Sequence, residues 1–90
     1  MEKQEIVKKV SEIVKGYSQF NSDNIEVDAD LRENYGVDSI ILVEMLVDLE
    51  CEFSVTFDSS MLTYDNFSTV TAISDYVYGK INGEGKELVV

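Results

Sequence analysis

The chain contains no histidine and a single cysteine, Cys51. Without histidine, it holds no Ser-His-Asp triad, no histidine general base and no histidine metal ligand of its own. One cysteine allows neither an intramolecular disulfide nor a cysteine-rich zinc site. The chain therefore has few means of catalysis by itself, and we do not expect an enzyme.

Basic residues are also scarce, since 7 Lys and Arg stand against 18 Asp and Glu, a net charge of −11. Such a surface repels phosphate backbones and anionic membranes, so we expect neither nucleic-acid binding nor membrane insertion. The first residues lack an apolar signal core, and no stretch approaches the roughly 20 apolar residues of a membrane span. We expect a cytoplasmic protein.

From Glu33 to Gly79 there is no Lys or Arg at all. A run of acidic residues is most often solvated surface, but one this long without a compensating base also fits a docking surface for basic partners. The sequence leaves both interpretations open.

The 90 residues, 44% of them hydrophobic, are enough for one domain with a small core. Apolar periodicity predicts a helix over 3–16, a second helix starting at Asp38-Ser39, a short helix over 58–64, and a last helix that ends near Gly79. The second helix has the strongest core stripe: Leu42, Met45, Leu46, Leu49 and Phe53. Either Ser68 or Thr69 is expected to cap the last helix.

Two segments are expected to lie outside the main helices. The stretch from Tyr17 to Asp38 is long for a connection in a compact domain, and its apolar residues predict that it is pinned to the core. Residues 82–90 are Gly-rich and polar, so we expect a domain over 1–81 followed by a flexible C-terminal tail.

The candidate site is Ser39, in the run Tyr35-Gly36-Val37-Asp38-Ser39-Ile40. A serine just before an apolar helix most often caps that helix. Here, however, Gly-x-Asp-Ser opens an acidic second helix after a long first loop. This arrangement, with the flanking segments over about residues 5–81, resembles the acyl carrier protein family, whose members carry 4′-phosphopantetheine on the serine of an Asp-Ser-Leu motif.

The resemblance implies an all-α fold, a small four-helix bundle with a long first loop and a short third helix. It also implies that Ser39 carries 4′-phosphopantetheine and that Asp38 helps to present the serine to a phosphopantetheinyl transferase. The function implied is the carriage of acyl intermediates as thioesters, in fatty-acid, polyketide or related secondary-metabolite biosynthesis. The partners would be that transferase and acyl-loading and acyl-processing enzymes with basic patches, acting on a monomer.

The sequence departs from the family pattern at Ile40, which replaces the usual leucine, and at Ile41, where an acidic residue is common. The helix face opposite the core stripe is therefore more apolar than in a typical fatty-acid carrier, and an exposed apolar patch indicates partner contact. We expect these residues to form the docking face: Ile40, Ile41, Glu44, Val47, Asp48 and Cys51. Packing of some of them against the loop or the short third helix is the alternative.

Other interpretations remain. Peptidyl and D-alanyl carriers share the fold and the modified serine, although Gly36-Val37-Asp38-Ser39 favours the acyl branch. An acidic adaptor or scaffold domain that is never modified is the alternative of a different class. A calcium-binding loop at Asp28-x-Asp30 fails, because Arg32 stands at a ligand position and Ser39 stands where the closing glutamate should be. We expect no metal site.

Overall fold

The computed structural model describes residues 2–20, 24–57 and 63–89, and in the last range the side chains as far as Asn82. Its elements are α1 (Lys3–Tyr17), α2 (Leu31–Tyr35), α3 (Ser39–Phe53), the 3-10 helix η2 (Tyr64–Phe67) and α4 (Val70–Val89). All regular structure in these ranges is helical, which confirms the predicted fold class. Over the same ranges, no helix combines the length and apolar character needed to cross a bilayer.

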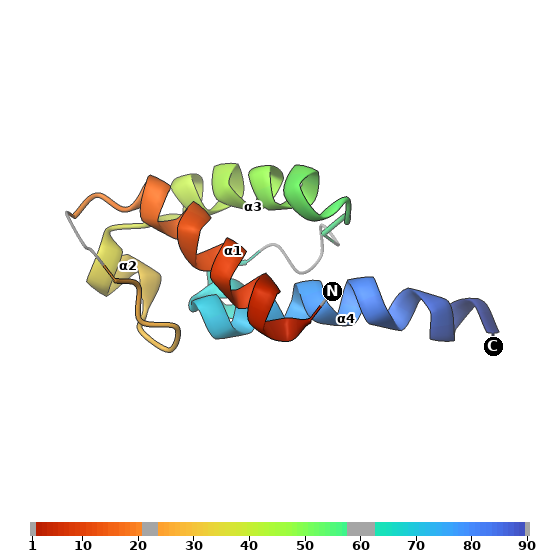
Figure 1. Ribbon diagram of the computed structural model, residues 1–90. Coiled ribbons are helices and arrows are strands. Elements are labelled where there is room, and N and C mark those ends of the chain that lie inside the picture. Colours follow the sequence, from red (N-terminus) through yellow and green to blue (C-terminus); the bar gives the residue numbers. More distant parts are fainter. Residues whose placement is uncertain (1, 21–23, 58–62, 90) are drawn as a thin grey trace.

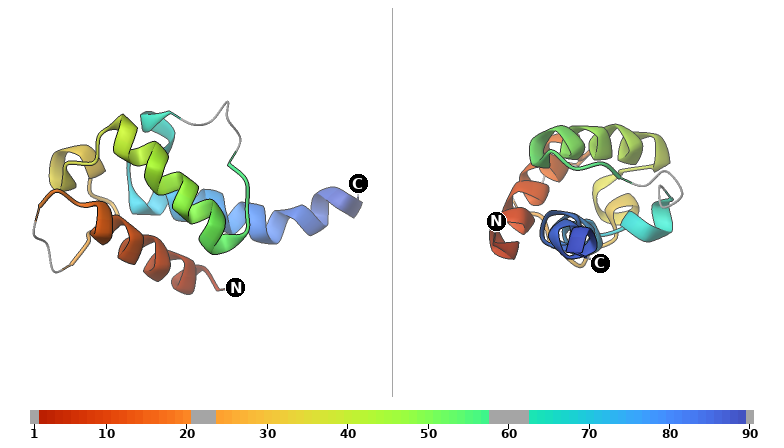
Figure 2. Two further views of the ribbon diagram at one scale, coloured as in Figure 1. Left: turned by 90° about the horizontal axis from the view of Figure 1, so that it is seen from above. Right: turned by 90° about the vertical axis from the view of Figure 1, so that its right-hand side faces the viewer.

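The helices are arranged around α4. Viewed along α4, α3 lies over it, α1 lies on one side, and α2 and η2 lie on the other (Figure 2, right). α1 packs against both α4 and α3 (Figure 1). The two short helices thus lie next to each other on one flank of the bundle, close to the start of α3.

The core is made by the apolar stripes that the sequence predicted. α1 buries Ile6, Val10 and Val14, and α3 buries the five residues of its predicted stripe, which are Leu42, Met45, Leu46, Leu49 and Phe53. An aromatic cluster closes the core beneath η2, where Phe67 meets Phe57 and Tyr76 edge to face, with ring centroids 5.5 and 5.3 Å away. Apolar burial on this scale is the main force that holds such a small domain together.

The prediction that the stretch between α1 and α3 is irregular is partly wrong, because this stretch contains α2. The Asp30 side chain caps this helix by accepting a hydrogen bond from the Glu33 N–H at 3.0 Å, and Gly36 ends it in the left-handed conformation, with φ +68°. The loop is pinned as expected: Leu31 is buried, and Thr71 N–H donates to the Val27 carbonyl at 2.9 Å.

The short third helix also differs from the expectation. Most of the predicted segment, residues 58–62, lies outside the described residues. The short helix that is described, η2, begins at Tyr64, where we expected the helix to end. Val55 and Phe57 in the preceding connector are buried, so this extended segment contributes to the core.

The last helix starts where predicted, and Thr69 rather than Ser68 caps it, since the Thr69 hydroxyl accepts a hydrogen bond from the Ala72 N–H at 3.0 Å. Its predicted end near Gly79 is wrong, because α4 continues to Val89. Gly79 is exposed, and a Cβ built on it would meet nothing within 4 Å. A glycine in such an open helical position costs about 1 kcal/mol relative to alanine and does not end a well-packed helix. The domain boundary at residue 81 stays a prediction.

Candidate functional site

Ser39 is the first residue of α3, and its side chain is exposed. The N-cap of the helix is Asp38, whose Oδ1 accepts a hydrogen bond from the Ile41 N–H at 2.9 Å. The sequence analysis considered Ser39 as the cap, whereas the structure assigns this role to Asp38. The Ser39 hydroxyl is therefore free of any capping role and faces solvent.

The turn before Ser39 is fixed from both sides. Val37 is fully buried, and its N–H donates to the Leu31 carbonyl at 3.1 Å. Gly36 adopts a left-handed conformation that side chains disfavour, and a Cβ there would lie 2.8 Å from Cβ of Gln19. Glycine is thus required where the chain after α1 passes over this turn. Ser39 comes directly after a turn that is held in place by these contacts.

Arg32 reaches the candidate serine from α2. Its Nη2 donates to Ser39 Oγ at 3.3 Å, and its guanidinium carbon lies 4.2 Å from the centroid of the Tyr64 ring. Sequence reasoning did not select either residue for the site. The contact between α2 and η2 joins residues far apart in sequence, so no local pattern could have revealed it.

Tyr64 also connects Arg32 to the α2 cap. Its hydroxyl accepts a hydrogen bond from the Arg32 N–H at 2.6 Å and donates one to Asp30 Oδ1 at 2.5 Å. Burial, together with the bond to Asp30, raises the pKa of Tyr64 to about 12. The same bond, with the Glu33 N–H, holds the pKa of the Asp30 carboxyl below its ordinary value.

Replacing Tyr64 with phenylalanine should destabilise the protein by about 1 kcal/mol near neutral pH, because two hydrogen bonds are lost while the ring remains. The neutral phenol is favoured by folding, so its contribution is complete below pH 10 and disappears as the pH rises toward about 12. The ionised Asp30 is favoured by folding, so its contribution is lost as the pH falls below the ordinary carboxyl range. Urea unfolding across pH should therefore show a difference in unfolding free energy between parent and variant. This difference should become smaller at both low and high pH.

The control is Tyr78→Phe, because Tyr78 is an exposed tyrosine on α4. We expect this variant to unfold like the parent at every pH. If the difference in unfolding free energy between the parent and Tyr64→Phe stays constant between pH 9 and 12, the role given to the Tyr64 hydroxyl is contradicted.

The outer face of α3 is apolar near Ser39, as the sequence indicated. Ile40 is 72% exposed and Val47 is 51% exposed, and Glu44 and Cys51 are also exposed. Val43, which the sequence analysis did not select, belongs to the same surface with 45% exposure. This exposed apolar strip is formed by Ile40, Val43 and Val47.

Two of the predicted docking residues are placed differently. Ile41 is only partly exposed and packs against the core. For this residue, packing rather than full exposure to a partner is what the structure shows. Asp48 is exposed, but its carboxylate accepts a hydrogen bond from the Tyr17 hydroxyl of α1, which raises the pKa of Tyr17. Glu44 is therefore the acidic group of this face for which no such bond is described.

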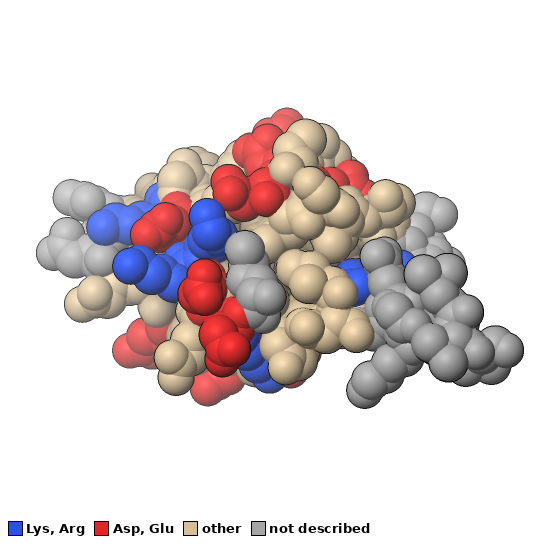
Figure 3. Space-filling view, turned by 45° about the vertical axis from the view of Figure 1, so that its right-hand side comes forward, with Lys and Arg blue, Asp and Glu red and all other residues tan. Residues whose placement is uncertain are grey.

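The charge on the surface is unevenly distributed between the helices. α1 carries Lys3, Lys8, Lys9 and Lys15, whereas α3 has four acidic residues and no base. On the face drawn in Figure 3, several basic side chains lie together and are mixed with acidic ones, while others lie apart from this group. An approaching basic partner is thus attracted to the α3 side of the molecule.

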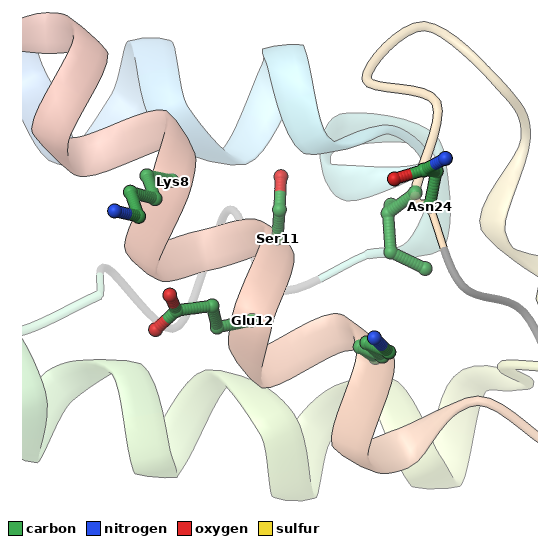
Figure 4. A pocket seen from close by; sticks show the side chains of 6 residues that line it. Lys8, Ser11, Glu12 and Asn24 are labelled. Atoms are coloured by element: carbon green, nitrogen blue, oxygen red, sulfur yellow. The ribbon is translucent and has the colours of Figure 1, made fainter.

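A surface depression on α1 does not belong to this site. It is lined by Lys8, Ser11, Glu12, Lys15, Asn24 and Ile25, and Figure 4 shows Asn24 approaching from the loop that follows α1. None of these residues is a predicted site residue. The Glu12 carboxylate on its wall also opposes the binding of an anion by the lysines.

Taken together, the site offers an exposed primary hydroxyl on a rigid turn at the start of a helix. Phosphate groups are favoured there by the positive end of the helix dipole. The Arg32 guanidinium beside Ser39 adds a positive charge at the same place. These residues fit a group attached through a phosphodiester, which marks a small carrier protein rather than a catalyst.

Comparison with known proteins gives the same class. A family described as "Phosphopantetheine attachment site" matches residues 8–77. The chain is 32% identical over 79 residues to an acyl carrier protein of Thermotoga maritima, covering 88% of this chain and 95% of that protein. It is 29% identical over 82 residues to an acyl carrier protein of Cyanidium caldarium, covering 91% and 93%.

The chain belongs to the acyl carrier protein family, whose prosthetic group is 4′-phosphopantetheine. It is a carrier and not an enzyme. Its partners include the enzymes that modify such carriers and those that process the groups they carry.

Proposed function

We propose that the protein carries acyl groups as thioesters on a 4′-phosphopantetheine arm attached to Ser39, within fatty-acid, polyketide or related secondary-metabolite biosynthesis in the cytoplasm. The observation that carries this proposal is the exposed Ser39 hydroxyl at the start of α3, directly after the capping Asp38. The arm supplies the thiol that holds the acyl group, so the chain needs no base or nucleophile of its own. What the chain provides is a fixed point of attachment.

Asp38 has a positioning role in this proposal. Its carboxylate holds the first turn of α3 through the Ile41 N–H, and its carbonyl accepts from the Leu42 N–H at 2.8 Å. These bonds fix the backbone on which Ser39 is presented to a phosphopantetheinyl transferase. The serine hydroxyl then stands clear of the helix, where an enzyme can reach it.

The proposal is tested by incubating the protein with coenzyme A and a phosphopantetheinyl transferase of broad specificity, followed by intact-mass measurement. We expect a gain of one phosphopantetheine group per chain. A protein that stays unmodified would support the scaffold alternative. Exclusive loading by an aminoacyl-activating enzyme, with no loading by acyl-transferring enzymes, would favour a peptidyl or D-alanyl carrier instead.

We further propose that partners dock on α3 through two kinds of contact. Glu44 and the base-free surroundings attract basic patches and raise the rate of encounter. The exposed apolar strip of Ile40, Val43 and Val47 then makes short-range contact, which governs the rate of dissociation. Ile41 and Asp48 contribute less, because one packs against the core and the other is bonded to Tyr17.

The effects of the two contacts should be distinguishable in the kinetics of binding to the transferase. Glu44→Lys should slow association several-fold and weaken its salt dependence. Ile40→Ala should leave association nearly unchanged and shorten the lifetime of the complex about three- to tenfold. Stopped-flow or surface-binding measurements give both rates.

Glu5→Lys is the matched control for charge, because Glu5 is exposed on α1 rather than on α3. It should affect association less than Glu44→Lys. Equal effects of the two charge changes, together with a parent-like lifetime for Ile40→Ala, would exclude α3 as the docking face.

A further inference from the structure

Arg32 is the only arginine of the chain, and no other base occurs between Glu33 and Gly79. Its guanidinium donates to Ser39 Oγ at 3.3 Å, which is the atom to which the phosphorus of the prosthetic group would be bonded. The other oxygens of that phosphate would be bonded to the same phosphorus, two bonds from Oγ. They would therefore come within reach of the same guanidinium.

The guanidinium is held at this place before any phosphate arrives. It stacks on the Tyr64 ring at 4.2 Å, and the Tyr64 hydroxyl is in turn fixed by the Arg32 N–H and the Asp30 carboxylate. A stacked arginine has lost part of its side-chain freedom already, so binding an anion costs it less entropy. Tyr64 thus acts as a platform for Arg32.

Acidic residues flank Ser39 and Arg32 in the sequence. Asp38 adjoins the serine, Glu33 lies in the same helix as Arg32, and both are exposed. No carboxylate among the described residues forms an ion pair with the Arg32 guanidinium. The fork of N–H groups on arginine is suited to phosphate oxygens, and its charge offsets the repulsion that these carboxylates would exert on a phosphodiester.

We propose that Arg32 binds the phosphate of the prosthetic group after Ser39 is modified, with Tyr64 holding the guanidinium in place. This inference rests on the proposed attachment at Ser39. The contact ties the root of the arm to α2 and, through Tyr64, to η2. Modification therefore stabilises the flank of the bundle that these two short helices form.

The test compares unmodified and modified protein in the parent and in Arg32→Gln, by thermal unfolding. We expect modification to raise the melting temperature of the parent by about 2–6 °C more than that of the variant, the range for a partly exposed ion pair in a domain of this size. Arg32→Lys should give an intermediate shift, since it keeps the charge and loses the fork. Lys8→Gln is the matched control, because it removes one charge from an exposed position on α1, and it should behave like the parent.

A second measurement observes the contact itself. The side-chain Nε–H resonance of Arg32 and the ³¹P resonance of the phosphodiester should differ between the parent and a Tyr64→Leu variant, which lacks the platform. If modification shifts the melting temperature of the parent and of Arg32→Gln equally, and these resonances do not change, the inference is overturned while the proposed function stands. If neither protein gains the group at Ser39, the proposed function falls as well, so the two failures are distinguishable.

Discussion

A Ser39→Ala variant should keep the fold of the parent and gain no phosphopantetheine. The attachment atom is removed, so the loss of modification should be complete. The helix should persist, because Asp38 and not Ser39 caps α3. We expect a change in unfolding free energy within about 0.5 kcal/mol, as for an exposed position without a capping role.

Intact-mass measurement after transferase treatment and thermal unfolding by circular dichroism give the two results on the same samples. Ser11→Ala, a serine change on α1, is the control and should be modified like the parent. Asp38→Ala provides the contrast in stability, since loss of an N-cap costs about 1 kcal/mol. A Ser39→Ala protein that still gains the group would refute the assignment.

A Phe67→Ala variant should lose about 3–5 kcal/mol of unfolding free energy, the usual cost of removing a buried phenyl ring. Phe67 is 1% exposed and packs edge to face against Phe57 and Tyr76. Because small domains have about 5–15 kcal/mol in total, this loss leaves little stability. The ring also anchors η2, the helix that carries Tyr64.

Urea unfolding measures this loss, with Phe20→Ala as the matched control. Phe20 is 53% exposed, so its truncation should cost less than about 1 kcal/mol. Phe67→Leu should fall between the two, since it refills part of the space. Similar midpoints for Phe67→Ala and Phe20→Ala would show that the aromatic cluster is not a centre of stability.

The long helices were predictable because each repeats its apolar residues at helical spacing. The α3 stripe from Leu42 to Phe53 is buried as expected, and so is the Val10 and Val14 stripe of α1. The bundle is determined by the burial of one apolar stripe on each helix, and the periodicity of the sequence indicates that stripe directly.

The short elements were not predictable from periodicity, because a five-residue helix has too few turns to show it. The signals for α2 lay in its caps instead: Asp30 three residues before Glu33, and Gly36 just after the last turn. Gly79 gave the opposite error, because glycine is common at helix ends, yet α4 continues past this exposed position to Val89.

For the site, the sequence supplied Ser39 and Asp38 but not the groups that surround them. Arg32 and Tyr64 meet across 32 positions of sequence, and only the packing of η2 beside α2 brings them together. The exposed face of α3, which we propose as the docking face, was outlined by the sequence. Helical spacing alone could not show that Ile41 packs against the core or that Tyr17 bonds Asp48.

The most direct test of the central claim is to locate the modified residue. Cleavage after Glu33 and Glu44 releases residues 34–44, in which Ser39 is the only serine. Tandem mass spectrometry of the transferase-treated protein should place the phosphopantetheine group on Ser39 of this peptide and on no other residue. A group found on a different serine, or a fully folded protein that gains none, would contradict the account.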